Sequence, residues 1–381
     1  LEPLAKRIHK RVLRSWIIQS DDTGLLVLDA DKPQGARKGH IWAHVGDGRF
    51  ASYQYSPDWK HEHPANFLKG CAGYLQTDGY KGYDALTGGP KLAIRVGCFM
   101  HVRRYFLKAF KAKAIDAAIP IDIIQRLYRI ERDSKNTGED ADARLARRRE
   151  FSAPLLDELD AWLAKHDGRH EPKSPLGKAI TYLKGQRGAL GAFLLDGQLE
   201  LDTGAVERAL RGIAVGRHNW LFAGSDAGAQ RAAILYTVIT SAKLHGLEPY
   251  AYLRDVLAKL GAGWPNRRLD ELMPDRWGRE QGIALPPLLL TELTETTKPG
   301  SRRRALTTRR RGSRTDRPRR RRPRSTRTSP PRSTPDPRHP ARRAPRRVAA
   351  TASPRAARPR ISPAMATPPR SAPRAPRGPT R

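Results

Sequence analysis

The pattern of apolar residues changes near Cys98, and this change limits the folds that the chain can adopt. Before Cys98, short runs rich in β-branched and aromatic residues are separated by glycine-containing turns, which is typical of strands. After it, apolar residues recur every three or four positions, as on one face of an amphipathic helix. Strands with few helices between them, followed by a long helical stretch, predict a mixed α/β fold with an all-helical part.

The expected elements follow from these two periodicities. Strands are expected at 16–29, 40–44, 50–55, 73–77 and 91–98. Helices are expected at 1–15, 64–68, 101–114, 232–244 and 250–260, with three further helical faces between 121 and 190. The third of these faces begins at Ser174 and Pro175, which supply an N-cap and a first helical residue. The ordered part is expected to end near Trp277.

The C-terminal segment differs in composition from the rest. Positions 301–381 contain 27 Arg, no Lys, two Asp and no aromatic residue, so they carry most of the net charge of +34. They also contain 16 of the 31 prolines. Such a composition cannot bury enough apolar surface to offset the entropy cost of ordering. We therefore expect a disordered basic tail at 281–381.

Cysteine use and hydropathy limit the class of protein. Cys71 and Cys98 lie in separate segments, without a CxxC pair or a disulfide framework, which is typical of a reducing cytosol. No apolar run approaches the roughly 18 residues of a membrane-spanning helix. The basic, amphipathic first segment does not resemble a signal peptide. We therefore expect a protein without a membrane partner.

Acidic residues in three distant segments are candidates for a site. Asp78 follows one expected strand, where polar residues are common. Asp21 and Asp22 lie next to each other in another strand, so they point to opposite faces and at most one is expected to face a shared site. Glu207 lies on a helix, where an ion pair with Arg211 one turn later is the ordinary explanation.

Together, one aspartate of the pair Asp21 and Asp22, with Asp78 and Glu207, predicts a metal site; the neighbouring apolar residues favour Asp21 only weakly. Mg²⁺ prefers oxygen ligands and keeps positions open for water and phosphate. Two such ions, about 4 Å apart, can hold the attacking and leaving oxygens of an in-line phosphoryl displacement. Aspartates on neighbouring strands and a glutamate on a crossing helix would supply the ligands. No His-rich or Cys-rich zinc spacing competes with this interpretation.

Basic residues accompany these acidic positions. A basic helix follows Cys98, and a basic turn is expected at 216–220, directly after the Glu207 helix. Their clustering favours contact with DNA phosphates, although a solvated basic face is the better explanation for any single residue. Trp220 and Phe222 are suited to stacking on an exposed base, but core packing is the favoured role for both.

At these acidic and basic positions, the chain resembles the transposases of the insertion sequence 66 family (TnpC type), and the resemblance extends from about Leu4 to Trp277. The resemblance lies in QTDGYKGYDAL (76–86), GCFMHVRRYF (97–106), SPLGKAITYL (174–183) and ERALRGIAVGRHNWLFAGSD (207–226). The helix around AKLHGLEPYAYLRDVLA and the ending RLDELMPDRW are also similar. Several long matches in the same order exclude a chance similarity.

The resemblance implies an RNase H-like catalytic domain whose DDE triad falls on Asp21, Asp78 and Glu207, with two Mg²⁺ or Mn²⁺ ions. It implies metal-dependent cleavage at transposon ends and attack of the 3′-hydroxyl on target DNA, in a homo-oligomeric complex at the bacterial nucleoid in the cytoplasm. Residues expected to support DNA binding or the active site are His101, Arg103, Arg104, Arg208, Arg211, Arg217 and Asn219.

The same resemblance divides the chain. Residues 1–115 would form the first part of the catalytic core, 116–198 an all-helical insertion, and 199–280 the second part of the core with the Glu207 helix. Residues 281–381 would form the tail.

Some features depart from the family. DDTG (21–24) stands where the family usually has Asp-Glu-Thr-Pro, and DTG (202–204) where it usually has Asp-Asn-Asn. The family's N-terminal region is not found here, so we expect an N-terminally truncated chain, and the tail is typical of translation past a frameshift. Two alternatives to an active transposase therefore stay open: an inactive remnant of a mobile element, and non-enzymatic nucleic-acid binding through the tail.

Overall fold

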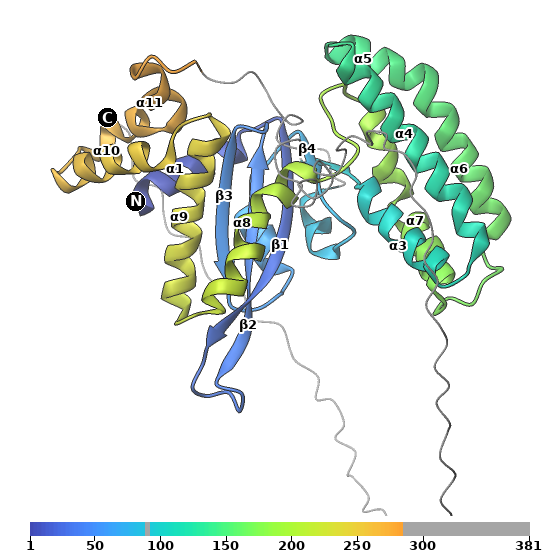
Figure 1. The fold of residues 1–381 in the computed structure, drawn as a ribbon, viewed down its shortest axis with the longest axis horizontal. Coiled ribbons are helices and arrows are strands. Elements are labelled where there is room, and N and C mark those ends of the chain that lie inside the picture. Colours follow the sequence, from blue (N-terminus) through green and yellow to red (C-terminus); the bar gives the residue numbers. More distant parts are fainter. Residues whose placement is uncertain (88–91, 285–381) are drawn as a thin grey trace, which may run out of the picture. The chain divides into compact units, whose positions relative to one another are not determined.

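A mixed six-stranded sheet organises the computed structural model of this chain (Figure 1). Its strands are β1 (Ile17–Leu28), β2 (Ala36–Gly46), β3 (Phe50–Ser56), β4 (Tyr74–Gln76), β5 (Ile94–Val96) and β6 (Phe222–Ala223). The order is β3-β2-β1-β4-β5, and β6 pairs with β1. β1, β2 and β3 pair antiparallel, whereas β4 and β6 run parallel to β1, and β5 runs parallel to β4. The mixed α/β prediction and its five strands are confirmed; β6 was not expected.

The structure describes residues 1–87 and 92–284. All of them belong to one of the chain's two units, Leu1–Thr307. The expected disordered tail lies outside the described residues. In the described part, no helix is both long enough and apolar enough to cross a membrane.

Helices follow the predicted periodicity closely. The α-helices are α1 (Glu2–Leu13), α2 (Glu62–Phe67), α3 (Phe99–Lys111), α4 (Ala118–Asn136), α5 (Ala141–Arg147), α6 (Ala153–His166), α7 (Pro175–Gly191), α8 (Gly204–Trp220), α9 (Asp226–Leu244), α10 (Pro249–Gly261) and α11 (Pro274–Glu280). Short 3-10 turns are η1 (Lys81–Leu86), η2 (Ile115–Ala117), η4 (Ala192–Leu194) and η5 (Asn266–Leu272), and η3 (Arg148–Ser152) is a π-helical turn. Ser174 caps α7 as predicted, because its Oγ accepts the N–H of Gly177 at 3.0 Å.

The basic turn expected at 216–220 is wrong, because α8 continues through Trp220. Gly216 permits this extension. A Cβ atom there would lie 2.7 Å from Nε1 of Trp220, so the indole one turn later occupies the space of the missing side chain. The helix stops at Leu221, whose φ is +59°. The contact of the Trp220 side chain with Gly216, one turn away, therefore overrides the low helix propensity of glycine.

The two faces of the sheet are covered by different helices. Leu25 and Val27 of β1 share a core with apolar residues of α8 and α9. Ile18, which has the opposite parity along β1, shares a core with residues of α1 and α10. In Figure 1, α8 crosses the strands near β1. The parity of a β1 residue thus decides whether it faces α8 or α1.

The helices from α4 to α7 form a further layer next to α3. Their apolar residues build one core with Phe99 and Phe106 of α3, and this core also includes Ile17, Tyr74 and Val96 from three strands. The expected helical insertion therefore shares its core with one end of the sheet. This arrangement positions α3 and α4 beside α8.

Candidate active site

The pattern Gln-x-Asp occurs twice, once in β1 and once at the end of β4. The parallel register pairs Gln19 with Gln76. Asp21 and Asp78 each follow their glutamine by two positions, and side chains two residues apart lie on the same face of a strand. Asp21 continues along β1, whereas Asp78 lies two residues beyond the end of β4, so the register places Asp21 and the end of β4 next to each other.

The paired glutamines also attach the start of α8 to this face. Gln19 Nε2 donates to Oε1 of Gln76 at 2.9 Å. Gln19 Oε1 accepts the N–H groups of Ala205 and Val206 at 3.1 and 3.2 Å. These donors belong to the first turn of α8, where N–H groups have no partner inside the helix. Glu207 lies in that turn, so the bonds hold the third acidic residue over the face that carries Asp21.

The Asp21 carboxyl lies in an acidic environment. Burial is the largest cause that raises its pKa to about 7, and the charges of Asp78, Asp22 and Glu207 add to it in that order. The N–H of Asp22 donates to Oδ1 of Asp21 at 2.8 Å and opposes the shift. Among the described residues, no Lys, Arg or His nitrogen lies within 4.0 Å of this carboxylate. A divalent cation would relieve this repulsion.

Asp22 faces the opposite side of β1. Its Oδ2 lies 2.6 Å from Nδ1 of His40, and its Oδ1 accepts the indole N–H of Trp59 at 3.0 Å. Both carboxylate oxygens are therefore engaged on the face away from Gln19. This arrangement agrees with the expectation that at most one of Asp21 and Asp22 faces a shared site.

Glu207 lies beside cations of α3. Its Oε1 is 3.6 Å from Arg104 and 4.0 Å from Nε2 of His101. Burial raises the pKa of Glu207, and Arg104 opposes this shift. Among the described ion pairs of Glu207 there is none with Arg211, so the ordinary explanation offered by the sequence is wrong. The pKa of His101 is lowered, chiefly by burial and then by Arg104, while Asp78 and Asp202 oppose the shift.

Asp202 is a fourth acidic residue that the sequence did not single out as a site residue. It accepts the hydroxyl of Tyr128 at 2.6 Å and the N–H of Gly204 at 2.9 Å. Its charge raises the pKa of Glu207 and opposes the lowered pKa of His101. Sequence reasoning missed Gln19, Gln76 and Asp202 as residues of the site. The repeated Gln-x-Asp pattern could have indicated the two glutamines, and a position five residues before Glu207 could have indicated Asp202.

The carboxylates do not form one tight cluster. Among residues 1–87 and 92–284, only Asp116, His166 and His170 have their ligand atoms within 4.8 Å of one another. In a site for two ions, however, only one carboxylate needs to reach both ions. Asp21 is influenced by both Asp78 and Glu207. The all-oxygen donor set is suited to Mg²⁺ or Mn²⁺.

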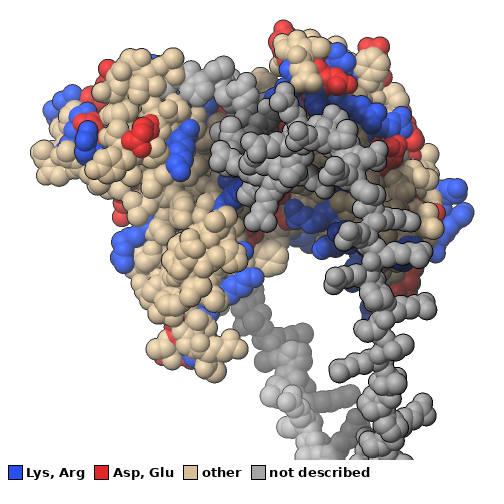
Figure 2. Space-filling view, in the orientation of Figure 1, with Lys and Arg blue, Asp and Glu red and all other residues tan. Residues whose placement is uncertain are grey.

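A large cleft of about 1630 Å³ opens beside this site, lined by residues of β1, α3, α4, α5 and α8. Asp21 and Glu207 line it, whereas Asp78 does not. Five of the predicted DNA-contacting residues also line it, namely His101, Arg104, Arg208, Arg211 and Arg217. Arg103 and Asn219 lie outside the lining. Figure 2 shows basic side chains over α4 and α5 in the orientation of Figure 1.

The C-terminal part of α8 contacts β1, the strand that carries Asp21. Arg217 donates to Oγ1 of Thr23 at 3.0 Å and to the carbonyl of Gly24. Trp220 is 37% exposed and Phe222 is 43% exposed. The core-packing role favoured for these two aromatic residues is therefore wrong.

The sequence and this geometry agree with a match to a known family. The model of the transposase IS66 family matches residues 1–231, and that of the IS66 C-terminal element matches residues 237–274. The chain belongs to the IS66 transposase family. The resemblance inferred from the motifs is thus confirmed.

Three relatives in this family come from Sinorhizobium fredii (strain NBRC 101917 / NGR234). The uncharacterized protein y4hP is 36% identical over 303 residues, which is 73% of this chain and 54% of the relative. The uncharacterized proteins y4qI and y4jD are each 32% identical, over 72% and 74% of this chain and 53% and 57% of the relative. The chain therefore spans about half the length of these IS66 relatives. No solved structure matches it.

Proposed function

We propose that the described residues form the RNase H-like DDE catalytic part of an IS66 transposase, which cleaves and joins DNA strands. One observation carries this proposal. The paired Gln19 and Gln76 each come two positions before an aspartate, Asp21 or Asp78, and Gln19 also accepts N–H groups from the first turn of α8, which carries Glu207. The charges of Asp78 and Glu207 both raise the pKa of Asp21, and Asp21 and Glu207 line the cleft, which supports a shared site.

Asp21, Asp78 and Glu207 would hold two Mg²⁺ or Mn²⁺ ions. When bound, such ions supply a Lewis acid for the phosphate and lower the pKa of the attacking hydroxyl. Asp21 would contribute to both ion positions, because its carboxyl is influenced by both other carboxylates. The bonds of Gln19 and Gln76 keep these positions fixed, as catalysis that depends on position requires.

DNA is the proposed partner. Arg104 is exposed beside Glu207, and Arg211 and Arg217 line the cleft from α8. Guanidinium groups suit phosphate contacts, which fix a nucleic acid without reading its sequence. Transposon ends and target DNA would be held here by a homo-oligomer, and association with the nucleoid would follow from such binding.

The proposed division of the chain follows the same scheme. Residues 1–115 and 199–280 would make the catalytic core, with 116–198 as the helical insertion. Residues 281–381 would be a disordered tail whose 27 arginines strengthen DNA binding without sequence preference. Because the chain spans only about half the length of these relatives, recognition of the element's ends is assigned to no residue of this chain.

The test is Mn²⁺-dependent nicking of supercoiled plasmid by the full chain. Asp78→Asn should abolish nicking, whereas Asp84→Asn should leave it unchanged. Asp84 is the matched control, because it is an exposed carboxylate in the same segment and pairs with Arg95 instead. Equal nicking by both variants would rule out the site. Binding of plasmid without any nicking, lost when 285–381 are removed, would instead favour the nucleic-acid-binding alternative.

A further inference from the structure

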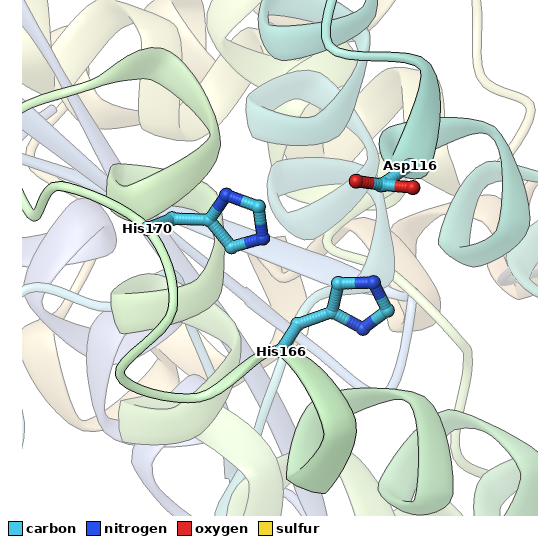
Figure 3. A group of neighbouring side chains, drawn as sticks. All are labelled: Asp116, His166 and His170. Carbon is cyan, nitrogen blue, oxygen red and sulfur yellow. The ribbon is translucent and has the colours of Figure 1, made fainter.

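A second group of possible metal ligands lies in the helical part, away from the three carboxylates. His166 ends α6, His170 lies in the loop that follows, and Asp116 lies in η2, between α3 and α4. Their ligand atoms all lie within 4.8 Å of one another. Figure 3 shows both imidazole rings and the carboxylate pointing toward a common space.

We propose that Asp116, His166 and His170 bind one transition-metal ion of the Zn²⁺ class. Two imidazole nitrogens and one carboxylate oxygen suit Zn²⁺ better than Mg²⁺ or Ca²⁺, which prefer oxygen ligands only. The site is separate from the proposed catalytic site and does not depend on it. A water molecule would complete a tetrahedral arrangement.

His166 is held in the orientation that a metal ligand needs. Its Nδ1 lies 2.8 Å from the carbonyl of Trp162, to which it can donate only through a proton on that nitrogen. Its ring also stacks on the indole of Trp162, with centroids 4.2 Å apart and planes at 17°. The side chain is 8% exposed. This contact leaves Nε2 with its lone pair, as the backbone contacts of metal-bound histidines do.

His245 allows a comparison with His166, because the two histidines make the same backbone contact but differ in the surroundings of Nε2. His245 makes the same contact to a carbonyl four residues earlier, but its Nε2 is buried without a hydrogen-bond partner in the described part of the chain. Nε2 of His166 instead faces two further ligand groups. A ring contact and the backbone contact alone therefore account for the buried position of His245. They do not account for the two further ligand groups that lie close to His166.

His170 and Asp116 complete the group from two other segments. The ring of His170 stacks on that of His166, with centroids 5.7 Å apart and planes at 11°. Gly168, with φ of +73°, provides the turn that brings the loop back. Asp116 is exposed. In a tetrahedral site with bonds of about 2.0–2.1 Å, ligand atoms lie about 3.4 Å apart, so the side chains would move closer together when an ion binds.

Such an ion would join the start of the helical part to the end of α6. Asp116 and His166 are 50 positions apart in the sequence, so the ion would close a long loop in the chain. The three ligands lie close together only in the folded protein, so the ion would bind the folded state and not the unfolded chain. It would therefore stabilise the helical part against unfolding.

The experiment is calorimetric titration of Zn²⁺ into the metal-free full chain, with thermal unfolding measured in parallel. The wild type should bind one equivalent more than Asp116→Asn or His170→Gln. In both variants the affinity of this site for Zn²⁺ should fall by more than the roughly 10–100-fold that results from losing a residue that only hydrogen-bonds to a metal ligand. His61→Gln is the matched control, because His61 is exposed and outside the group. It should bind like the wild type.

The outcomes separate this site from the proposed catalytic one. Asp116→Asn changes an exposed side chain and should fold normally even where His170→Gln does not. Mn²⁺-dependent nicking should be unchanged in Asp116→Asn. Equal Zn²⁺ stoichiometry in the wild type and Asp116→Asn would overturn the proposal, as would Zn²⁺ binding that disappears with Asp21→Asn and not with Asp116→Asn.

Discussion

Replacing Asp21 by asparagine should stabilise the metal-free protein above pH 7. The folded state raises the pKa of Asp21 from 3.8 to about 7, mainly through burial. Between these values the folded protein keeps a proton that the unfolded chain has lost. The resulting stability is fully present below about pH 4 and is lost as the pH rises toward 7. At 1.36 kcal/mol for each pKa unit, the loss amounts to roughly 4 kcal/mol.

An asparagine at this position carries no charge at any pH, so it avoids this loss. Urea unfolding should therefore show nearly equal free energies of unfolding for the wild type and Asp21→Asn at pH 4. At pH 8 the variant should be more stable by up to about 4 kcal/mol. Adding Mg²⁺ at pH 8 should stabilise the wild type and have little effect on Asp21→Asn.

Asp22→Asn is the control, since it changes the neighbouring residue in the same strand. Asp22 accepts the indole N–H of Trp59 on the other face, and its replacement should give a smaller gain at pH 8 than that of Asp21, because it removes only one of the charges that act on Asp21. The reasoning fails if the stability difference between Asp21→Asn and the wild type is the same at pH 4 and pH 8. It also fails if Asp22→Asn shows the larger change.

Three further outcomes follow from particular contacts. Gln76→Leu should lower the free energy of unfolding by about 1–3 kcal/mol, because it removes an acceptor of the Gln19 amide and leaves the carbonyls of Gly97 and Glu200 without their side-chain donor; urea unfolding beside the exposed Gln198→Leu measures this. Arg148→Met should cost about 3–5 kcal/mol, because it removes a fully buried cation and leaves the largely enclosed Glu131 with one cation fewer, whereas Arg149→Met on the surface should be neutral by the same assay. Arg217→Ala should weaken DNA binding for all sequences and lower the salt slope by about 1; fluorescence anisotropy at several salt concentrations checks this, with Arg254→Ala, outside the cleft, as control.

Much of the secondary structure could be predicted because it depends on local patterns. Leu4, Ile8 and Val12 recur with helical spacing, and all three are buried in α1. Ser174 and Pro175 mark the start of α7 through chemistry confined to one turn. The family could also be identified, because several long motifs occur in the family's order.

The prediction of a turn at 216–220 failed because a side-chain contact one helical turn apart favours a helix in that segment. Glycine and short polar residues favour a turn locally, but Trp220 packs on Gly216 and α8 continues. The exposed Trp220 and Phe222 follow from the same extension. The histidine group was not predicted either, because its carboxylate comes from η2, 50 positions before His166.

The sequence by itself determined the strands, the helices and the membership of the IS66 family, because periodicity and motifs are properties of neighbouring residues. Only the tertiary structure decided which carboxylates face one another. Asp21 and Asp22 are alike in sequence, and the pairing of Gln19 with Gln76 and the docking of α8 distinguish them. Register and burial depend on residues far apart in the chain, so the pKa of Asp21 and the ion pairs of Glu207 exist only in the folded protein.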